Sequence, residues 1–313
     1  MDCDWDFQLK NPGLASSELT NGVARTGQRA LLYATGMDEE DMKKPFVAVI
    51  NSFSEMVPGH MHMRELAEQV KYGILEGGGI PRETGTIAIC DGLCQGHCGM
   101  RYPLPSRDLI ADSIEMVVQA HHFDAMVLIP GCDKIIPGML MAAARLDIPA
   151  IVVTGGYMPL GTFRGKEVVH IRAQDKVGAM AEGKIDPDLY NGLIQHSWGI
   201  CGGCTSMTTA NSMCMMAEAM GMTLPGNSSM SAVSSEIRNL SYRAGLRIME
   251  MVRQGITARQ IITPESIRNA IAVDMAVAGS SNLILHLPAI AHEAGYDEPW
   301  WKVFDEMSNT VPL

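Results

Sequence analysis

Several features are scarce in this sequence, and each scarcity excludes a class of protein. The 313 residues carry 24 Lys and Arg against 35 Asp and Glu, a net charge of −11 with no long basic run, which argues against nucleic acid and anionic membranes as partners. No stretch reaches the roughly 18 apolar residues that a membrane helix needs. Residues 1–6 are acidic where a secretory signal would be basic, so we expect no signal peptide. Eight cysteines are too sparse for a disulfide scaffold, which favours reduced thiols in a cytoplasmic protein.

Aromatic residues are also few, at 5%, whereas methionine is frequent, with 24 residues. Because flexible methionine side chains fill irregular gaps, we expect most of them in the core rather than on a recognition surface. A hydrophobic content of 47% and a charged content of 19% are typical of a globular protein. A chain of this length can bury a full core and can hold one large domain or two.

Short apolar runs alternate with helical patterns over residues 45–156. This order predicts an α/β core in which helices flank a parallel sheet. Ser106 is expected to cap one of these helices, and Pro137 to open another, where proline is tolerated. The expected strands are 46–50, 86–89, 125–129 and 150–153, and the expected helices between them are 60–75, 106–120 and 137–146.

The remaining segments differ in composition from this core. Residues 1–44 are expected to form a helical lead-in, with a helix at 28–37. Residues 157–206 turn polar and irregular, which predicts a connector that carries a cysteine-containing loop. Residues 207–313 are predicted to be mainly helical, with helices at 209–220, 231–254, 264–278, 281–294 and 300–307.

Polar or glycine-rich residues follow all four expected strands. They are Asn51-Ser52, Cys90-Asp91, Gly131-Cys132-Asp133-Lys134 and Gly155-Gly156. Ordinary turns also favour such residues, but the carboxyl ends of parallel strands meet at one sheet edge, where α/β proteins bind ligands. Two Cys-Asp pairs at this edge predict a site for one thiolate-bound and one oxygen-bound metal, since thiolates select iron–sulfur or zinc and carboxylates select magnesium or manganese.

Some residues near this edge leave alternatives open. Lys134 should repel a metal ion, so either its charge is removed or it pairs with Asp133 or with a substrate carboxylate. Cys201-Gly202-Gly203-Cys204 fits zinc, an iron–sulfur cluster or a redox dithiol. Cys90, Cys94 and Cys98 could hold a cluster by themselves, although the glycines between them indicate a loop. For His60, His62 and His97, a metal shared by His60 and His62 is not expected, and a capping or substrate hydrogen-bonding role is the milder interpretation.

From about residue 20 onward the chain resembles the dihydroxy-acid dehydratase and phosphogluconate dehydratase family. Several long motifs in the same order carry this resemblance, and their wording is more similar to the dihydroxy-acid branch. The matching stretches are Asn51-Ser52, Pro58-Gly59-His60, Cys90-Asp91-Gly92, Gly96-His97, Gly99-Met100, Leu104-Pro105-Ser106-Arg107, Ile110-Ala111-Asp112-Ser113, Gly131-Cys132-Asp133-Lys134, Pro137-Gly138-Met139, Cys204, Met207, Thr209-Ala210-Asn211-Ser212-Met213, Pro225-Gly226-Asn227 and Gly279-Ser280-Ser281-Asn282 with His286.

The resemblance implies a hydro-lyase that dehydrates a 2,3-dihydroxy carboxylic acid to a 2-keto acid, as in branched-chain amino acid biosynthesis. It implies an iron–sulfur cluster on Cys90, Cys132 and Cys204. Members with a 2Fe-2S cluster have a cysteine at the position of Gly59, so the glycine here favours 4Fe-4S and leaves 2Fe-2S as the alternative. The resemblance also implies Mg²⁺ bound by Asp91, Asp133 and a carbamylated Lys134, while Cys94 and Cys98 remain spare thiols.

Family members continue into a second, β-rich domain, which this sequence lacks. We therefore expect either a domain fragment or one subunit of an enzyme whose second domain is encoded separately, and in both cases an oligomer. Three alternatives remain: a non-catalytic iron–sulfur-binding or regulatory subunit, a sugar-acid dehydratase, and a zinc or redox protein that uses Cys201 and Cys204.

Overall fold

A four-stranded parallel sheet forms the centre of the protein. The computed structural model describes residues 7–312, so the acidic start at residues 1–6 lies outside the described residues. The strands are β1 (Phe46–Asn51), β2 (Ile80–Gly85), β3 (Ala125–Ile129) and β4 (Ala150–Val152), in the order β2-β1-β3-β4. β1, β3 and β4 are buried throughout, as expected for apolar strands that are covered on both faces. The α/β fold with a parallel sheet is therefore confirmed.

One predicted strand is wrong. The apolar run at 86–89 is not a strand, and β2 instead covers the preceding residues, pairing Phe46 with Ile80 and Asn51 with Gly85. β2 is an edge strand with a half-exposed face, so it tolerates Pro81 and alternating polar residues that a central strand would exclude. The segment after Gly85 runs on beyond the sheet toward Cys90.

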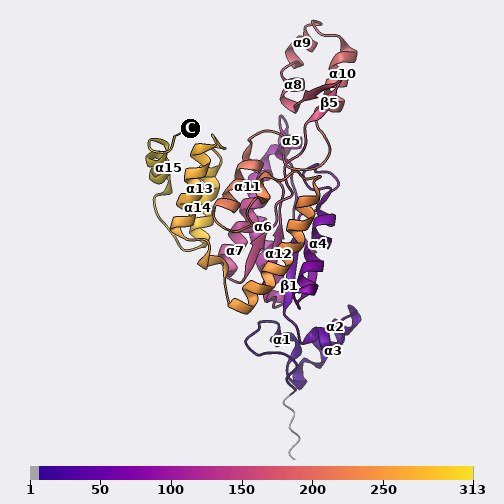
Figure 1. Ribbon diagram of the computed structural model, residues 1–313, viewed down its shortest axis with the longest axis vertical. Coiled ribbons are helices and arrows are strands. Elements are labelled where there is room, and N and C mark those ends of the chain that lie inside the picture. Colours follow the sequence, from indigo (N-terminus) through magenta and orange to yellow (C-terminus); the bar gives the residue numbers. More distant parts are fainter. Residues whose placement is uncertain (1–6, 313) are drawn as a thin grey trace, which may run out of the picture.

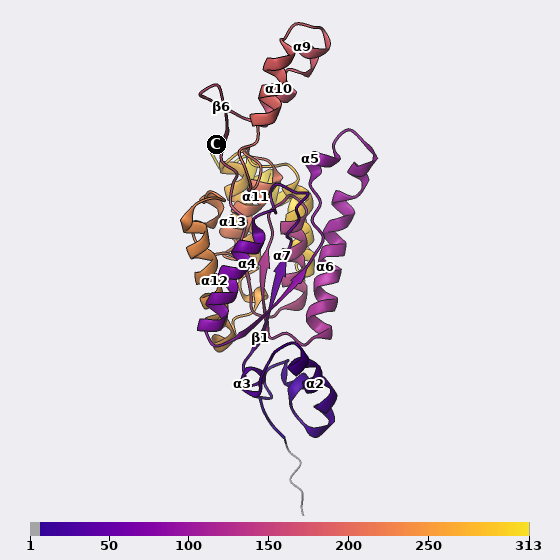
Figure 2. The same ribbon diagram turned by 90° about the vertical axis from the view of Figure 1, so that its right-hand side faces the viewer.

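Helices cover both faces of the sheet, which Figure 2 shows most clearly. α4 (Met63–Glu76) and α12 (Ser235–Gln254) cover one face, and α6 (Pro103–Ala120) and α7 (Ile135–Leu146) cover the other. Side chains of β1 alternate between the two cores, with Val47 facing α4 and α12 and Ala48 facing α6 and α7. Ser106 does not cap α6, because Pro103 already begins the helix and the Ser106 hydroxyl donates to the Pro103 carbonyl at 2.6 Å.

The C-terminal part is mainly helical, as predicted. α11 and α14 pack on α7, and α13 and α15 pack on these helices in turn, which extends the core on that side (Figure 1). α12 begins four residues later than predicted because Ser234 caps it, accepting a hydrogen bond from the Ile237 amide at 3.3 Å. The bounds are α11 Thr209–Ala219, α13 Pro264–Ala276, α14 Leu283–Glu293 and α15 Trp300–Ser308.

Residues 157–206 are more ordered than the predicted irregular connector. They contain the hairpin β5 (Gly161–Phe163) and β6 (Lys166–Val168), followed by α8 (His170–Gln174), α9 (Val177–Ala181) and α10 (Pro187–His196). Figure 1 shows this segment as an arm that projects from the body. The segment is polar because most side chains of a projecting arm are exposed to solvent rather than buried. The division of the chain into four segments stays a prediction.

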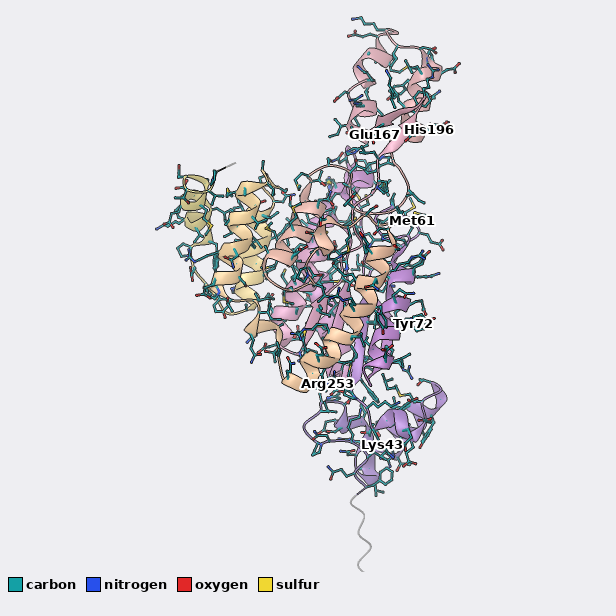
Figure 3. The ribbon with its side chains drawn as sticks, in the orientation of Figure 1. Lys43, Met61, Tyr72, Glu167, His196 and Arg253 are labelled. Carbon is teal, nitrogen blue, oxygen red and sulfur yellow. The ribbon has the colours of Figure 1, made fainter. Side chains whose placement is uncertain are left out.

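The lead-in before residue 45 lies at the opposite end of the molecule, as the labels Lys43 in the lead-in and Glu167 in the arm show in Figure 3. It consists of α1 (Ser17–Thr20), a 3₁₀ turn at Val23–Arg25, α2 (Thr26–Ala34) and α3 (Glu39–Met42). α2 ends before Gly36, whose φ of +85° is the left-handed conformation that glycine favours. None of the helices in residues 7–312 is both long and apolar enough to span a membrane.

Candidate functional site

Three loops that leave the sheet bring the candidate residues together. β3 ends at Ile129, and α7 begins only at Ile135, with Lys134 as its N-cap residue. Gly131 is required in this loop, because a Cβ there would lie 2.3 Å from the Met63 side chain and 2.7 Å from the Gly59 carbonyl oxygen. The site therefore forms where the loop after β1 and the loop after β3 approach each other closely.

Lys134 lies between two carboxylates. Its Nζ is 3.2 Å from Asp91 Oδ2 and 2.9 Å from Asp133 Oδ1, and only 9% of the lysine side chain is exposed. The structure therefore brings together the three residues predicted to bind Mg²⁺, with Lys134 forming an ion pair with each aspartate. Asp91 reaches this place although β2 ends well before it, because the extended segment at 86–90 carries the chain to the same edge.

The two carboxylates differ in their electrostatics. Burial, followed by the charge of Asp133, raises the pKa of Asp91 to about 6. Burial alone would also raise the pKa of Asp133, but the neighbouring His286 and Lys134 outweigh it, and the pKa is lowered. Oδ1 of Asp91 is buried and receives no hydrogen bond from any described residue. Two half-buried carboxylates, one with a free buried oxygen, are a donor set that suits a hard cation.

The thiols of Cys132, Cys90 and Cys204 form the second half of the site. Burial raises the pKa of Cys132 well above its ordinary value, and the charges of Cys90 and Cys204 raise it further. Burial likewise raises the pKa of Cys204, to which the charges of Cys90 and Asp133 add. Cys90 is thus near enough to both other thiols to affect their pKa values, and a joint role of the three thiols as cluster ligands stays a prediction. In residues 7–312 no three His, Cys, Asp or Glu side chains converge on one point as they would around a single ion.

Cys201 and Cys204 lie in different surroundings. Burial raises the pKa of both thiols, but the nearby charge at Cys201 is Glu65, whereas at Cys204 it is Cys90 and Asp133. Cys201 is 7% exposed. The two thiols thus have different charged neighbours, and a joint zinc or redox role for them stays a prediction.

His60 and His62 are buried and hold the loops in place. Nδ1 of His60 is 2.7 Å from the Ser52 carbonyl, and Nε2 of His62 is 2.7 Å from the Gly155 carbonyl. Burial lowers the pKa of His60 to about 4 and also lowers that of His62, so both imidazoles are neutral. Each therefore donates its single N–H to a carbonyl of a strand-end loop. His62 does not cap α4 through its side chain, and a role of either histidine toward the substrate stays a prediction.

Three further residues shape the site, although no role for them there was predicted. Asn211, at the start of α11, donates through Nδ2 to the carbonyls of Cys204 and Ser206, which fixes the loop that carries Cys204. His286 on α14 lies 3.6 Å from Asp133, and Arg107 on α6 contacts His286. All three stand in motifs noted above, and their only signal was this membership, since nothing in their local spacing points to Asp133 or Cys204.

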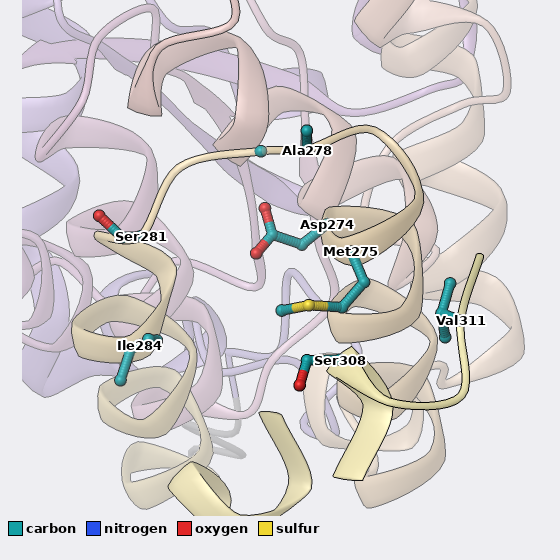
Figure 4. Close-up of a pocket in the computed structure, with 8 residues that line it drawn as sticks. Asp274, Met275, Ala278, Ser281, Ile284, Ser308 and Val311 are labelled. Atoms are coloured by element: carbon teal, nitrogen blue, oxygen red, sulfur yellow. The ribbon is translucent and has the colours of Figure 1, made fainter. Parts of the chain in front are cut away.

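A separate cavity lies away from these residues. Its volume is about 350 Å³, and its lining includes Asp274 and Met275 of α13, Ser281, Ile284 of α14 and Ser308 of α15 (Figure 4). None of the residues predicted to bind a cluster or Mg²⁺ lines it. The cavity is thus distinct from the site at the sheet edge.

Fold and site together define an α/β protein with a thiol and carboxylate centre at the carboxyl edge of a parallel sheet. Residues 44–313 match the family described as "Dihydroxy-acid/6-phosphogluconate dehydratase N-terminal", and the chain belongs to this family. It is 49% identical over 304 residues to the dihydroxy-acid dehydratase of Clostridium novyi and 50% identical over 299 residues to dihydroxy-acid dehydratase 1 of Methanosarcina acetivorans. These alignments cover 95% and 96% of this chain but 54% of each relative, so the chain spans about half the length of those proteins.

Proposed function

We propose that this chain forms the cluster-binding and metal-binding half of a hydro-lyase that dehydrates a 2,3-dihydroxy carboxylic acid to a 2-keto acid. The observation that carries the proposal is the position of Lys134 between Asp91 and Asp133, two residues after the buried Cys132. The names of the relatives support the reaction. Because the chain spans about half of those relatives, turnover is proposed for an assembly that also contains the remaining half.

The carboxylate side of the site fits Mg²⁺. This ion takes oxygen ligands and commonly one or two carboxylates, and Asp91 has a buried oxygen without a hydrogen bond from the described residues. The Lys134 ammonium now supplies the positive charge between the carboxylates. Addition of CO₂ to the neutral amine gives a carbamate and releases one proton, which converts Lys134 from a competing cation into an anionic oxygen ligand. Asp91, Asp133 and carbamylated Lys134 would then hold Mg²⁺.

The thiol side fits an iron–sulfur cluster. Burying thiolates beside each other and beside carboxylates is unfavourable, which is why the pKa values of Cys132 and Cys204 are raised. A bound cationic iron centre would reverse this effect and favour the thiolates. We assign Cys90, Cys132 and Cys204 as ligands and favour 4Fe-4S. Position 59 adjoins Cys132, since a Cβ at Gly59 would lie 3.0 Å from Cys132 Sγ. Because this residue is glycine, it supplies no thiol beside Cys132.

In the proposed reaction the C2 proton and the C3 hydroxyl leave as water, and the enol becomes the ketone. When bound, the open iron would act as a Lewis acid on the departing hydroxyl and Mg²⁺ would stabilise the developing enolate. The chain itself would hold these two groups in place. Asp91, Asp133 and Lys134 lie on the Mg²⁺ side of the site, and the buried Cys132 lies on the cluster side. His60 and His62 keep the surrounding loops in register through their carbonyl contacts.

Exposed apolar side chains around this end of the body support association with a covering domain. Met56 is 75% exposed, Tyr102 65% and Ile200 56%. Exposed apolar groups of this kind are common at interaction surfaces. The second half of the enzyme, in the same polypeptide or as a separate subunit, is the proposed partner.

The experiment that tests the proposal measures iron and acid-labile sulfide per chain after anaerobic reconstitution. About four irons with matching sulfide are expected for 4Fe-4S, and about two would indicate 2Fe-2S and remove the argument for Cys90. Bound zinc without labile sulfide would contradict the proposed dehydratase mechanism. Incubation with ¹³C-bicarbonate should give a carbamate NMR signal that is lost in Lys134→Arg, which keeps the charge but cannot form a stable carbamate.

Two other functions make different predictions. A non-catalytic iron–sulfur or regulatory subunit would bind the cluster but give no turnover with its partner half. The family description also names 6-phosphogluconate dehydratase, so a sugar acid is the alternative substrate class. Turnover of the reconstituted assembly with a branched 2,3-dihydroxy acid and with an aldonate would distinguish these possibilities.

A further inference from the structure

His286 connects the carboxylate centre to a helix far away in the sequence. It lies in α14 and is fully buried, with Nε2 at 3.6 Å from Asp133 Oδ1. Its other ring nitrogen, Nδ1, is 3.4 Å from Arg107 Nη1 on α6. The imidazole therefore stands between a guanidinium and a carboxylate.

Arg107 determines which nitrogen of His286 carries the proton. A guanidinium has only donors, so Nδ1 must be the acceptor of this contact. An imidazole that accepts a hydrogen bond at Nδ1 is neutral and has a single N–H. That N–H is on Nε2, where it points at Asp133. The contact with Arg107 thus fixes the tautomer of His286.

Arg107 is itself held firmly. Nη1 also donates to the Leu285 carbonyl at 3.2 Å, and Nε and Nη2 donate to Asp108 Oδ1 at 3.2 and 3.1 Å. α6 can approach α7 closely here because a Cβ at Gly138 would lie 2.7 Å from the Arg107 carbonyl oxygen. Three elements, α6, α14 and the loop before α7, are thus fixed around Asp133.

The contact between His286 and Asp133 is longer than a hydrogen bond while Lys134 attracts the same oxygen. Oδ1 of Asp133 has no well-formed hydrogen bond from any described residue. Once the lysine loses its positive charge, as the proposed function requires, the Nε2–H of His286 is the nearest donor left to orient this carboxylate.

We propose that Arg107 and His286 act as positioning residues that orient Asp133 for Mg²⁺. Residues that hydrogen-bond to a metal ligand typically alter metal affinity by about 10- to 100-fold when removed. This inference rests on the proposed function, since it requires Asp133 to be a ligand.

The test is Mn²⁺ binding. The chain is first incubated with bicarbonate, and binding is then measured as the loss of the EPR signal of free Mn²⁺. His286→Leu is expected to weaken Mn²⁺ binding at least about 10-fold. His286→Gln places an amide donor near the position of Nε2 and is expected to recover most of the affinity. His292→Gln is the matched control, because His292 lies on the same helix but is exposed and pairs only with Asp297. It should bind Mn²⁺ as the parent does.

A second variant keeps the test valid where His286→Leu fails to fold, as judged by circular dichroism. Arg107→Met removes the donor that fixes the tautomer and should weaken Mn²⁺ binding several-fold while leaving His286 in place. Unchanged affinity in both Arg107→Met and a folded His286→Leu would overturn the positioning role but leave the Mg²⁺ site intact. If the parent chain itself binds no Mn²⁺, the metal site of the proposed function fails, and the positioning role fails with it.

Discussion

Gly73 of α4 and Gly245 of α12 lie back to back, where the two helices cross over the sheet. A Cβ on Gly73 would be 2.0 Å from the Tyr242 carbonyl oxygen, and a Cβ on Gly245 would be 2.2 Å from the Val70 carbonyl oxygen. Each hypothetical Cβ is also 2.9 Å from the Cα of the other glycine. The backbones of α4 and α12 are thus in direct contact, and no side chain can be accommodated between them.

Gly73→Ala or Gly245→Ala should destabilise the fold by about 3 kcal/mol or more, because the added methyl group meets backbone rather than a flexible side chain. Gly27→Ala in α2 is the matched control, since a Cβ at Gly27 meets nothing within 4 Å. That variant should gain about 0.5–1 kcal/mol from the better helix propensity of alanine. Urea unfolding measures all three. Equal stability of Gly73→Ala and Gly27→Ala would contradict the close crossing.

This crossing illustrates how far the sequence could predict the fold. Both helices were predicted, at 60–75 and 231–254, because each has its own apolar period. Their contact was not predicted, since a glycine in one helix carries no sign of the partner it meets. β2 was misplaced for a related reason: an edge strand buries too little to need an apolar run, so the more apolar 86–89 was taken instead.

The candidate site shows the same limit. Asp91, Asp133 and Lys134 were expected together because strand ends share one edge, and the structure places them in contact. His286 and Arg107 are 179 residues apart and meet only through the packing of α14 and α6. Tertiary contacts of this kind leave no periodic signal in a single sequence. Which metal and which cluster bind stays a prediction.

The carboxyl of Asp274, which lines the separate cavity (Figure 4), should make stability depend on pH. Burial raises its pKa to about 6, above its ordinary value of 3.8, so the folded chain holds this proton more tightly than the unfolded chain. The stability that the protonated carboxyl contributes is complete below about pH 3.8 and is lost as the pH rises through about 6. Asp274→Asn is permanently neutral and should avoid this loss.

Unfolding by urea at pH 4, 5, 6 and 7 should therefore show the Asn variant gaining stability relative to the parent as the pH rises. The difference between the two should be small at pH 4 and level off above about pH 7. A difference that is constant over this range would show that Asp274 titrates normally in the folded chain.

Asp124 should be important for docking the lead-in on the core. Its carboxylate accepts hydrogen bonds from the Ser16 amide at 2.9 Å, the Ser16 hydroxyl at 2.5 Å and the Phe46 amide at 2.7 Å, and the residue is 8% exposed. Asp124→Asn leaves one acceptor oxygen for these donors and turns an amide group toward the rest. A loss of about 2–3 kcal/mol is expected, because buried donors remain unsatisfied.

Urea unfolding measures this loss, and trypsin cleavage within the lead-in should become faster at the same time. Asp297→Asn is the control: Asp297 forms an exposed ion pair with His292 at 2.7 Å, and such pairs contribute about 1 kcal/mol at most. If the two variants are equally stable, Asp124 is not the residue that secures the lead-in.

Substitutions at Cys90 and Cys94 would test which thiol is the third ligand of the proposed cluster. Cys90 is among the charges that raise the pKa of both Cys132 and Cys204, after burial, whereas Cys94 is not. Cys90→Ser should therefore lose most of the iron and sulfide that the parent chain takes up on reconstitution, because a serine hydroxyl is a poor iron ligand. Cys94→Ser, a matched change four residues away, should retain both.

Circular dichroism before reconstitution checks that both variants are folded, and the EPR spectrum after reduction reports the cluster type. Retention of a full cluster in Cys90→Ser together with its loss in Cys94→Ser would move the third ligand to Cys94. Loss in both variants would instead assign the whole loop, rather than one thiol, to cluster assembly.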